Sequence, residues 1–186
     1  MFSRLRRLHP RLQNIQLLPS ESTLAIGTDT MHNRLVLLKA LPHNTGAWTI
    51  YNHLRCQSLN LCAPRLYHCH NFDDIVITEC EYIPGKDLLN HINDSPDMDH
   101  PVMLIMKQLL AQVESYQKHS LSHLDIKPEN IVWNPKTKKI RVIDFEAMRT
   151  HSAEGSLELG VPLGTSNYMS PEVIFSSTVH RNTDLW

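Results

Sequence analysis

A nine-residue stretch in the second half of the chain reads Ser122-His123-Leu124-Asp125-Ile126-Lys127-Pro128-Glu129-Asn130. It places an acid, a base and an amide at short intervals, directly after a long amphipathic segment. Asp125 can accept a proton, Lys127 can neutralise a phosphate, and Asn130 can offer an uncharged oxygen to a metal ion. Together these side chains suit phosphoryl transfer better than hydrolysis. We therefore interpret the stretch as a catalytic loop.

Two further motifs follow this loop in order. A short apolar run leads into Asp144-Phe145-Glu146, and residues 164–172 end in Ser170-Pro171-Glu172. The loop resembles the H-R-D-x-x-x-x-N motif of protein kinases, although Leu124 stands where that family usually has Arg. The later motifs are similar to the family's D-F-G and to the end of its activation segment. Three motifs in this order are far more specific than one alone, and the resemblance covers about residues 15–186.

The resemblance implies a fold class and a domain division. We expect an α+β, two-lobe protein-kinase-like fold with a small antiparallel β N-lobe and an incomplete, mainly helical C-lobe. Residues 1–14 are expected to be a basic extension, 15–82 the N-lobe, and 83–186 a partial C-lobe with hinge, catalytic loop and activation segment. The last three residues resemble the start of the family's D-x-W helix. The chain is then a fragment, a shortened relative, or a piece completed by a partner chain.

Apolar patterns support this division. Short runs at 15–19, 24–27, 34–41 and 74–79 predict strands. Helical spacing predicts a helix over 45–61 that uses Trp48, Ile50, Tyr51 and Leu54.

The clearest helix is predicted over 101–119, where Met side chains are expected in the packing. A turn-rich spacer at 134–137 predicts a hairpin between residues 131–133 and 140–143. The apolar face of the helix comprises Val102, Ile105, Met106, Leu109, Val113 and Tyr116.

The resemblance also implies ATP and Mg²⁺ as cofactors. Lys39 lies in an apolar run similar to the family's V-A-I-K strand, whose lysine holds the nucleotide phosphates. Backbone groups of Glu81 and Ile83 would bind the adenine edge, with Cys80 as gatekeeper. Asp87 would contact the ribose or, equally well, cap a helix. Asn130 and Asp144 would hold the metal ion.

Several positions depart from the family pattern. Residues 17–24 contain no glycine where a glycine loop is expected, so Ser20 and Ser22 would replace it only in part. The predicted helix at 45–61 carries no glutamate for Lys39. Lys39 then pairs with Asp144, another acid takes the role, or the site is impaired.

Composition excludes several classes of protein. The 186 residues are 41% hydrophobic and 20% charged, with a formal net charge of -1. These values oppose disorder, a membrane span and global attraction to nucleic acid or lipid. The basic start lacks the apolar region of a secretory signal, which predicts an intracellular, cytoplasmic protein with the nucleus left open. The four cysteines lack paired C-x-x-C spacing, so free thiols are favoured over a zinc site.

The leading interpretation is a serine/threonine protein kinase that transfers the ATP γ-phosphoryl group to a protein hydroxyl. Lys127 and Thr165 resemble the Ser/Thr pattern rather than the tyrosine-specific one. Asp125 would act on the substrate hydroxyl and Lys127 on the transferred group. One alternative is a truncated pseudokinase or decoy that binds a kinase or its substrate. A related small-molecule phosphotransferase is a third, which residues 165–172 argue against.

Overall fold

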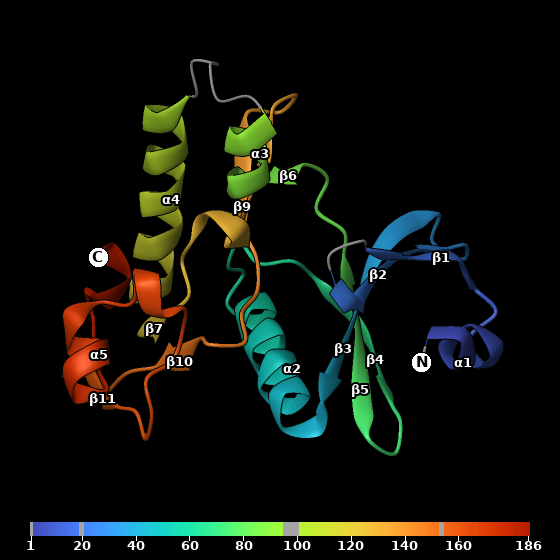
Figure 1. Ribbon diagram of the computed structural model, residues 1–186, viewed down its shortest axis with the longest axis horizontal. Coiled ribbons are helices and arrows are strands. Elements are labelled where there is room, and N and C mark those ends of the chain that lie inside the picture. The colour runs from blue at the N-terminus through green and yellow to red at the C-terminus, as the bar shows by residue number, and fades with distance from the viewer. Residues whose placement is uncertain (1, 19–20, 95–100, 153–154) are drawn as a thin grey trace. The chain divides into compact units, whose positions relative to one another are not determined.

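The chain divides into two compact units in the computed structural model, which describes all residues except 1, 19–20, 95–100 and 153–154. Unit 1 comprises Met1–Gln57 and Pro64–Ile83, and unit 2 comprises Ser58–Ala63 and Pro84–Trp186. Unit 1 contains an antiparallel sheet, and unit 2 contains helices with short strands (Figure 1). The predicted α+β, kinase-like fold is confirmed.

Unit 1 is built on a five-stranded sheet in the order β1-β2-β3-β5-β4, in which every neighbouring pair is antiparallel. All four predicted strands are present, with bounds shifted by a few residues. The sequence of the fifth strand, β4, shows little alternation of apolar and polar residues. This segment is a strand because it pairs with β5. The strands are β1 (Leu12–Leu18), β2 (Glu21–Asp29), β3 (Arg34–Pro42), β4 (Leu66–Asn71) and β5 (Ile75–Glu81).

The N-terminal segment is part of the core of unit 1. Helix α1 (Phe2–Leu8) buries Phe2 and Leu5, which are one turn apart on one face. They pack with Leu12 at the start of β1 and with apolar side chains of the sheet. Residues 1–14 were expected to be a basic extension, and three of them, Phe2, Leu5 and Leu12, contribute to the core of unit 1.

Helix α2 (His43–Ser58) forms where a helix was predicted, but the predicted face is wrong. Trp48, Tyr51 and Leu54 are about half exposed, at 48%, 50% and 53%. A Cβ on Gly46 would lie 2.2 Å from the Val76 side chain. The helix therefore packs against β5 with the side that contains Gly46. The buried side chains are small or polar and carry no acid: Gly46, Thr49, Asn52, His53 and Cys56.

Unit 1 also contains a buried network of charges centred on Glu79 of β5. The guanidinium of Arg11 donates two hydrogen bonds to the Glu79 carboxylate, at 2.9 and 2.6 Å. His70 Nε2 lies 3.2 Å from the same carboxylate. Arg11 also lies 3.3 Å from Asp29, whose second arginine partner is Arg34 at 3.1 Å. The network connects the start of β1 to strands β2, β4 and β5.

These contacts change the pKa values of both carboxylates. Burial alone would raise the pKa of Glu79, but the hydrogen bonds with His70 and Arg11 outweigh it and lower the pKa to about 2. Asp29 also has its pKa lowered to about 2, because His32 and Arg11 outweigh burial. Both side chains are fully buried and charged at neutral pH, so each depends on its cationic partner.

Unit 2 combines α-helices and short 3-10 helices with small sheets. Strands β6, β8 and β9 form one sheet, β7 pairs with β10, and β11 pairs with β12. The predicted hairpin is confirmed as β8–β9. The helices are α3 (Leu88–Asp94), α4 (Val102–Gln117), α5 (Pro171–Ser176) and the 3-10 helices η1 (Pro128–Asn130), η2 (Ser166–Tyr168) and η3 (Thr183–Leu185). The strands are β6 (Lys86–Asp87), β7 (Leu121–Ser122), β8 (Ile131–Asn134), β9 (Lys139–Val142), β10 (Arg149–Thr150), β11 (Ser156–Glu158) and β12 (Thr178–His180).

Helix α4 matches the predicted helix, but only part of its predicted apolar face is buried. Ile105, Val113 and Tyr116 are buried, whereas Val102 and Met106 are 57% and 44% exposed. The inner face includes glutamines, whose side-chain oxygens accept backbone N–H groups of β9. Because α4 packs on the β8–β9 hairpin through these residues, Met106 lies outside the buried face. The prediction that the methionines are packed is therefore wrong.

We predict that Arg11→Met destabilises unit 1 by stranding the buried Glu79 carboxylate. Breaking one side of a buried ion pair removes roughly 3 to 5 kcal/mol from the free energy of unfolding. Chemical denaturation at neutral pH measures this loss. Arg65→Met, at an exposed arginine of the same unit, is the matched control and should change little.

The same variant should have a distinct pH profile. Because Glu79 has a lowered pKa in the folded chain, its stabilising contribution is present above its ordinary value of 4.5 and is lost as the pH falls towards 2. The deficit of Arg11→Met should therefore shrink as the pH falls and Glu79 becomes protonated. Adding Glu79→Gln should recover part of the loss at neutral pH. A deficit that is independent of pH would contradict this account.

Candidate active site

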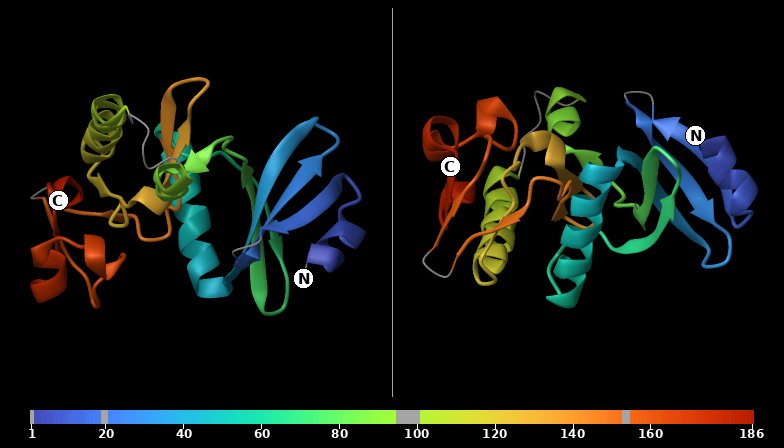
Figure 2. Two further views of the ribbon diagram at one scale, coloured as in Figure 1. Left: turned by 45° about the horizontal axis from the view of Figure 1, so that its top comes forward. Right: turned by 90° about the horizontal axis from the view of Figure 1, so that it is seen from below.

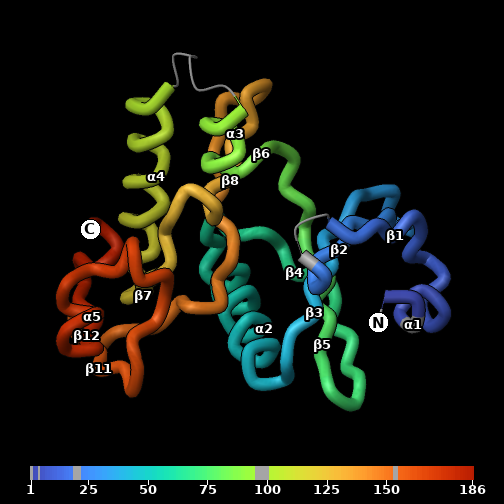
Figure 3. The backbone as a smooth tube through the Cα atoms, viewed as in Figure 1, coloured from blue at the N-terminus to red at the C-terminus, as the bar shows by residue number. Residues whose placement is uncertain are grey.

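The catalytic-loop stretch of unit 2 is held by a carboxylate from the last residues of the chain. Asp184 in η3 accepts the backbone N–H groups of His123 at 2.6 Å and Leu124 at 2.9 Å. Burial raises the pKa of Asp184, while His123 and the two N–H donors act in the opposite direction. Figure 3 follows the backbone from β7 through this loop to β8, and β10, which Figure 1 labels, pairs with β7.

Asp125 is the centre of a compact polar cluster. Its Oδ1 accepts the Thr165 hydroxyl at 2.7 Å, and its Oδ2 accepts the Asn130 amide at 2.8 Å. Lys127 Nζ lies 3.2 Å from the same Oδ2. Burial alone would raise the pKa of Asp125, but Thr165, Lys127 and Asn130 together hold it below its ordinary value. The carboxylate is therefore ionised and oriented at neutral pH.

Thr165 completes this cluster and was absent from the predicted site residues. Lys127 Nζ donates to Thr165 Oγ1 at 2.7 Å, so the hydroxyl links the lysine to Asp125. Gly164 makes this approach possible, because its φ is +108° and a Cβ would lie 2.2 Å from the Leu124 carbonyl oxygen. A hydroxyl directly after a glycine is the signal in the sequence that could have identified it.

Asn130 and Asp144 are brought together by the backbone. The Ile143 N–H donates to the Asn130 carbonyl at 2.9 Å, so Asp144 follows directly on the residue bonded to Asn130. The side-chain amide nitrogen of Asn130 donates to Asp125, which leaves Oδ1 as its acceptor group. A carboxylate and an amide oxygen are ligands that suit Mg²⁺, which usually completes its shell with water and substrate phosphates. This donor set fits the predicted metal pair.

Phe145, the residue after Asp144, is fully buried in an aromatic cluster. Its ring packs edge-on against Tyr116 of α4, with centroids 6.1 Å apart, and against His123 of the loop, at 5.0 Å. Burial lowers the pKa of His123, so the imidazole is neutral at neutral pH. The cluster connects α4, the catalytic loop and the segment after Asp144. Glu146, which follows, is partly buried.

Leu124 packs where the family usually has an arginine. It is 8% exposed and lies in a cluster with Val173 of α5 and Val179 of β12. Glu172 accepts the Thr183 hydroxyl at 2.8 Å on the same side of unit 2. Both views of Figure 2 place the C-terminal elements, drawn in red, together beside α4. Apolar packing and the β11–β12 pairing therefore order the segment that follows Asp144 and Phe145.

In unit 1, Lys39 lies opposite Thr78 in the pairing of β3 with β5. Glu79 is the next residue and lies opposite Leu38, so its side chain is on the other face of the sheet. Glu79 is therefore not the acid that pairs with Lys39. Burial raises the pKa of Cys80, the predicted gatekeeper, to about 12, so its thiol is not nucleophilic at neutral pH.

The remaining predicted nucleotide contacts differ in how well they are placed. The Glu81 N–H donates to the Arg65 carbonyl at 2.7 Å, so an N–H donor to a ligand would come from Ile83. Ser22 is exposed in β2, and Ser20 lies outside the described residues. Leu18 pairs with Glu21, so two residues join β1 to β2. The glycine loop that the resemblance implied falls partly on residues 19–20, outside the described residues.

Asp87 acts as a helix cap in the structure. Its Oδ1 accepts the Asn90 backbone N–H at 2.9 Å, and its Oδ2 accepts the Asn90 side-chain amide at 2.6 Å. These bonds stabilise the start of α3, which was the alternative interpretation of this residue. A ribose contact would compete with them.

The cysteines provide no clustered metal site. Cys56 and Cys80 are buried, whereas Cys62 and Cys69 are exposed, and all four are free. Across the part of the chain that the structure describes, no group of three His, Cys, Asp or Glu side chains is arranged to hold a metal ion. No helix among these residues is long and apolar enough to cross a membrane.

Comparison with known proteins agrees with this geometry. The protein kinase domain family matches residues 50–186. A probable myosin light chain kinase from Dictyostelium discoideum is 30% identical over 140 residues, which cover 75% of this chain and 28% of the relative. Human myosin light chain kinase family member 4 is 31% identical over 127 residues, covering 66% and 32%. The chain belongs to the protein kinase family and spans less than a third of the length of these relatives.

We predict that Gly164→Ala disrupts the contact between Thr165 and Asp125. The added Cβ would clash with the Leu124 carbonyl, and alanine is strained at a φ of +108°. We expect a loss of roughly 1 to 3 kcal/mol in the free energy of unfolding, and a rise in the pKa of Asp125, measured by carbon NMR of its carboxyl group. Gly160→Ala is the matched control, because nothing lies within 4 Å of its added Cβ. Equal effects of the two substitutions would contradict this role for Gly164.

Proposed function

We propose that this chain carries the catalytic half of a serine/threonine protein kinase that transfers the ATP γ-phosphoryl group to a protein hydroxyl. The observation that supports it best is the cluster of Asp125, Lys127, Thr165 and Asn130, joined by contacts of 2.7 to 3.2 Å. A module that only binds a partner has no chemical need for an ionised, oriented carboxylate next to a lysine. Membership of the family adds independent support.

Each residue of the cluster has a role in this proposal. Asp125 accepts a hydrogen bond from the substrate hydroxyl, orients it for attack and receives its proton. Lys127 stabilises negative charge on the transferred group. Thr165 holds both side chains at their separation. The hydroxyl of Thr165 and the ammonium of Lys127 are also why we propose Ser/Thr rather than Tyr as the acceptor.

The metal and nucleotide roles follow from the fit of their residues. Asn130 and Asp144 would hold Mg²⁺, Lys39 would contact the nucleotide phosphates, and Ile83 with Glu81 would bind the adenine edge. When bound, the Mg²⁺ nucleotide supplies the phosphoryl group and charge neutralisation for its transfer. The Phe145 ring next to Asp144 is fully buried, which anchors this part of the chain.

A pseudokinase or decoy is the second candidate, and two observations favour it. The buried face of α2 carries no acid that could pair with Lys39, and residues 17–24 contain no glycine. Both features lower the affinity that we expect for the nucleotide. The intact cluster around Asp125 favours catalysis.

The proposal predicts that Asp125→Asn abolishes most transfer. Asparagine keeps the size of the side chain but cannot receive the proton, so we expect turnover to fall by a factor on the order of 10² or more, with nucleotide affinity nearly unchanged. The assay is radiolabelled phosphate transfer to a peptide library. Asp94→Asn, at an exposed aspartate paired with Lys86, is the control. Unchanged turnover in Asp125→Asn would refute the catalytic role.

The proposal also predicts metal-dependent nucleotide binding. If Asn130 and Asp144 hold Mg²⁺, affinity for ATP measured by calorimetry should fall when EDTA replaces the ion. Asp144→Ala should remove that difference, because it deletes the charged ligand. Equal affinity of the unmodified chain with Mg²⁺ and with EDTA would favour the decoy.

A further inference from the structure

Two histidines join the N-terminal segment to the sheet of unit 1. His9 lies between α1 and β1, and its Nε2 is 3.1 Å from Nδ1 of His70 on β4. The centroids of the two rings are 4.3 Å apart. The other nitrogen of His70, Nε2, lies 3.2 Å from the Glu79 carboxylate of β5. The contacts therefore run from His9 through His70 to a buried carboxylate.

The hydrogens on these nitrogens limit how many protons the pair can hold. Glu79 has a pKa of about 2 and only accepts hydrogen bonds near neutral pH, so Nε2 of His70 must carry a hydrogen. In the neutral pair, Nδ1 of His70 then accepts the hydrogen on Nε2 of His9. One added proton can be placed on His70, with His9 as the acceptor. Two added protons put a hydrogen on each of the facing nitrogens, and the contact must break.

The surroundings of His9 favour its neutral form. The charged and titratable groups that face it are His70 and His68 of β4, Glu79 of β5 and Arg11, the residue before β1. Burial lowers the pKa of His9, and His70, Arg11 and His68 lower it further, whereas Glu79 acts in the opposite direction. Arg11 already donates two hydrogen bonds to the Glu79 carboxylate, so this acid has a cationic partner without His9.

Helix α1 is short enough for a single contact to affect its docking. It has seven residues, and a helix of this length is not stable in water without packing partners. Phe2 and Leu5 pack in the core of unit 1, whereas Leu8 is exposed. The His9 N–H donates to the Leu5 carbonyl at 2.9 Å, so His9 also closes the end of the helix. A change at His9 is therefore transmitted directly to α1.

The ion pair of Arg11 with Glu79 limits this change to the residues before it. The pKa of Arg11 is raised and that of Glu79 is lowered, so both stay charged between about pH 5 and 8, where histidine titrates. The start of β1 therefore stays joined to β5 when the contact between His9 and His70 breaks. The boundary falls at Pro10, which is exposed.

We propose that the pair of His9 and His70 is a pH-sensitive contact, which holds α1 on the sheet while His9 is neutral and releases it when His9 gains a proton. The released segment binds this proton more tightly than the docked one, because docking lowers the pKa of His9. Docking is therefore strongest above the ordinary value of 6.5 and weakens as the pH falls below it. Release exposes Phe2 and Leu5. This inference does not depend on phosphoryl transfer.

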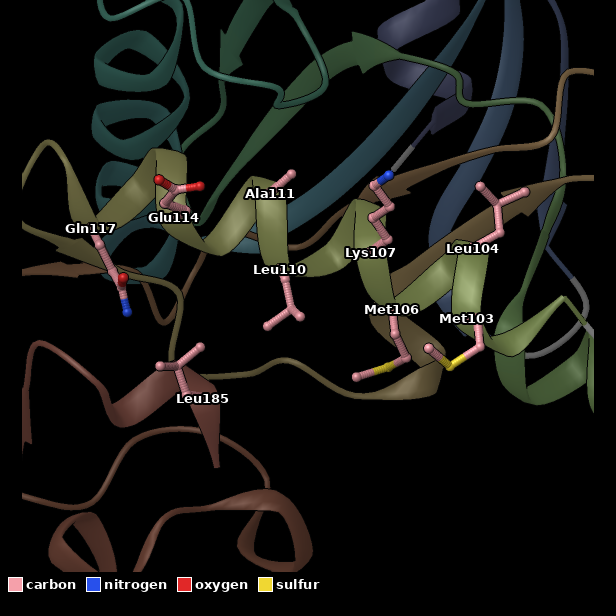
Figure 4. Close-up of a pocket in the computed structure, with 9 residues that line it drawn as sticks. All are labelled: Met103, Leu104, Met106, Lys107, Leu110, Ala111, Glu114, Gln117 and Leu185. Atoms are coloured by element: carbon pink, nitrogen blue, oxygen red, sulfur yellow. The ribbon is translucent and has the colours of Figure 1, made fainter.

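Hydrogen exchange of the full 186-residue chain, followed by mass spectrometry over a pH series, tests the contact. Rates are corrected for the intrinsic effect of pH. We expect the protection of residues 2–9 to fall at least about threefold between about pH 7.5 and 5.5, within the limit of about tenfold per pH unit for uptake of one proton. Helix α4 of unit 2, drawn in Figure 4, contains no histidine and is the internal reference, whose protection should not change.

His9→Gln is the decisive variant. Glutamine can donate to a neutral His70 or accept from a charged one, so it keeps the hydrogen bond but takes up no proton. The protection of α1 should therefore become independent of pH over this range. His68→Gln, at an exposed histidine of the same strand as His70, is the matched control and should keep the pH dependence of the unmodified chain.

Titration of the His9 ring by NMR gives a second readout. His70→Gln removes one of the charges that oppose protonation of His9, so the pKa of His9 should rise towards 6.5 in that variant. Protection of residues 2–9 that does not depend on pH in the unmodified chain would overturn the proposal. A pH dependence that survives in His9→Gln would do the same.

Discussion

The carboxylate of Asp184 constrains the rest of unit 2. It accepts two consecutive N–H groups of the catalytic loop, at 2.6 and 2.9 Å, from a position 61 and 60 residues further along the chain. Leu124 has a φ of +68°, which is uncommon for a residue with a side chain, and the two hydrogen bonds help hold the loop there. In this loop conformation Asp125 accepts the hydrogen bond from Thr165, and the Phe145 ring packs edge-on against His123. The loop of the site therefore depends on a carboxylate about 60 residues away in the sequence as much as on its own motif.

Leu124 changes how the segment after Asp144 is ordered. An arginine at this position could bind a phosphate added to that segment, whereas the leucine packs against Val173 and Val179. Apolar packing needs no modification to form, and Gly164 allows the segment to approach the loop backbone closely. The geometry around Asp125 is thus built by burial and hydrogen bonds, without a phosphate clamp.

Unit 1 uses its buried charges differently. Glu79 pairs with Arg11 and His70 on the face of the sheet away from Lys39, so this acid connects the N-terminal segment to the sheet. The buried face of α2, in contrast to β5, contributes no acidic side chain to unit 1. Unit 1 therefore has electrostatic stability from the network at Glu79, while the surroundings of Lys39 remain the part of the chain that least resembles the family.

The sequence by itself determined the family, the α+β class, most strands and helices, and the cluster of Asp125, Lys127 and Asn130, because these depend on local periodicity and on motifs of fixed spacing. Only the tertiary structure decided which helix faces are buried. Gly46 of α2 packs against Val76, which leaves the aromatic side chains of this helix exposed. In α4, Ile105 packs against the β8–β9 hairpin, whereas Met106 stays exposed. The tertiary structure also decided that Thr165 lies in the cluster around Asp125 and that Phe2, Leu5 and Leu12 lie in the core of unit 1. These outcomes rest on contacts between residues far apart in the chain, where close packing and buried charge choose among faces that the local pattern leaves equivalent.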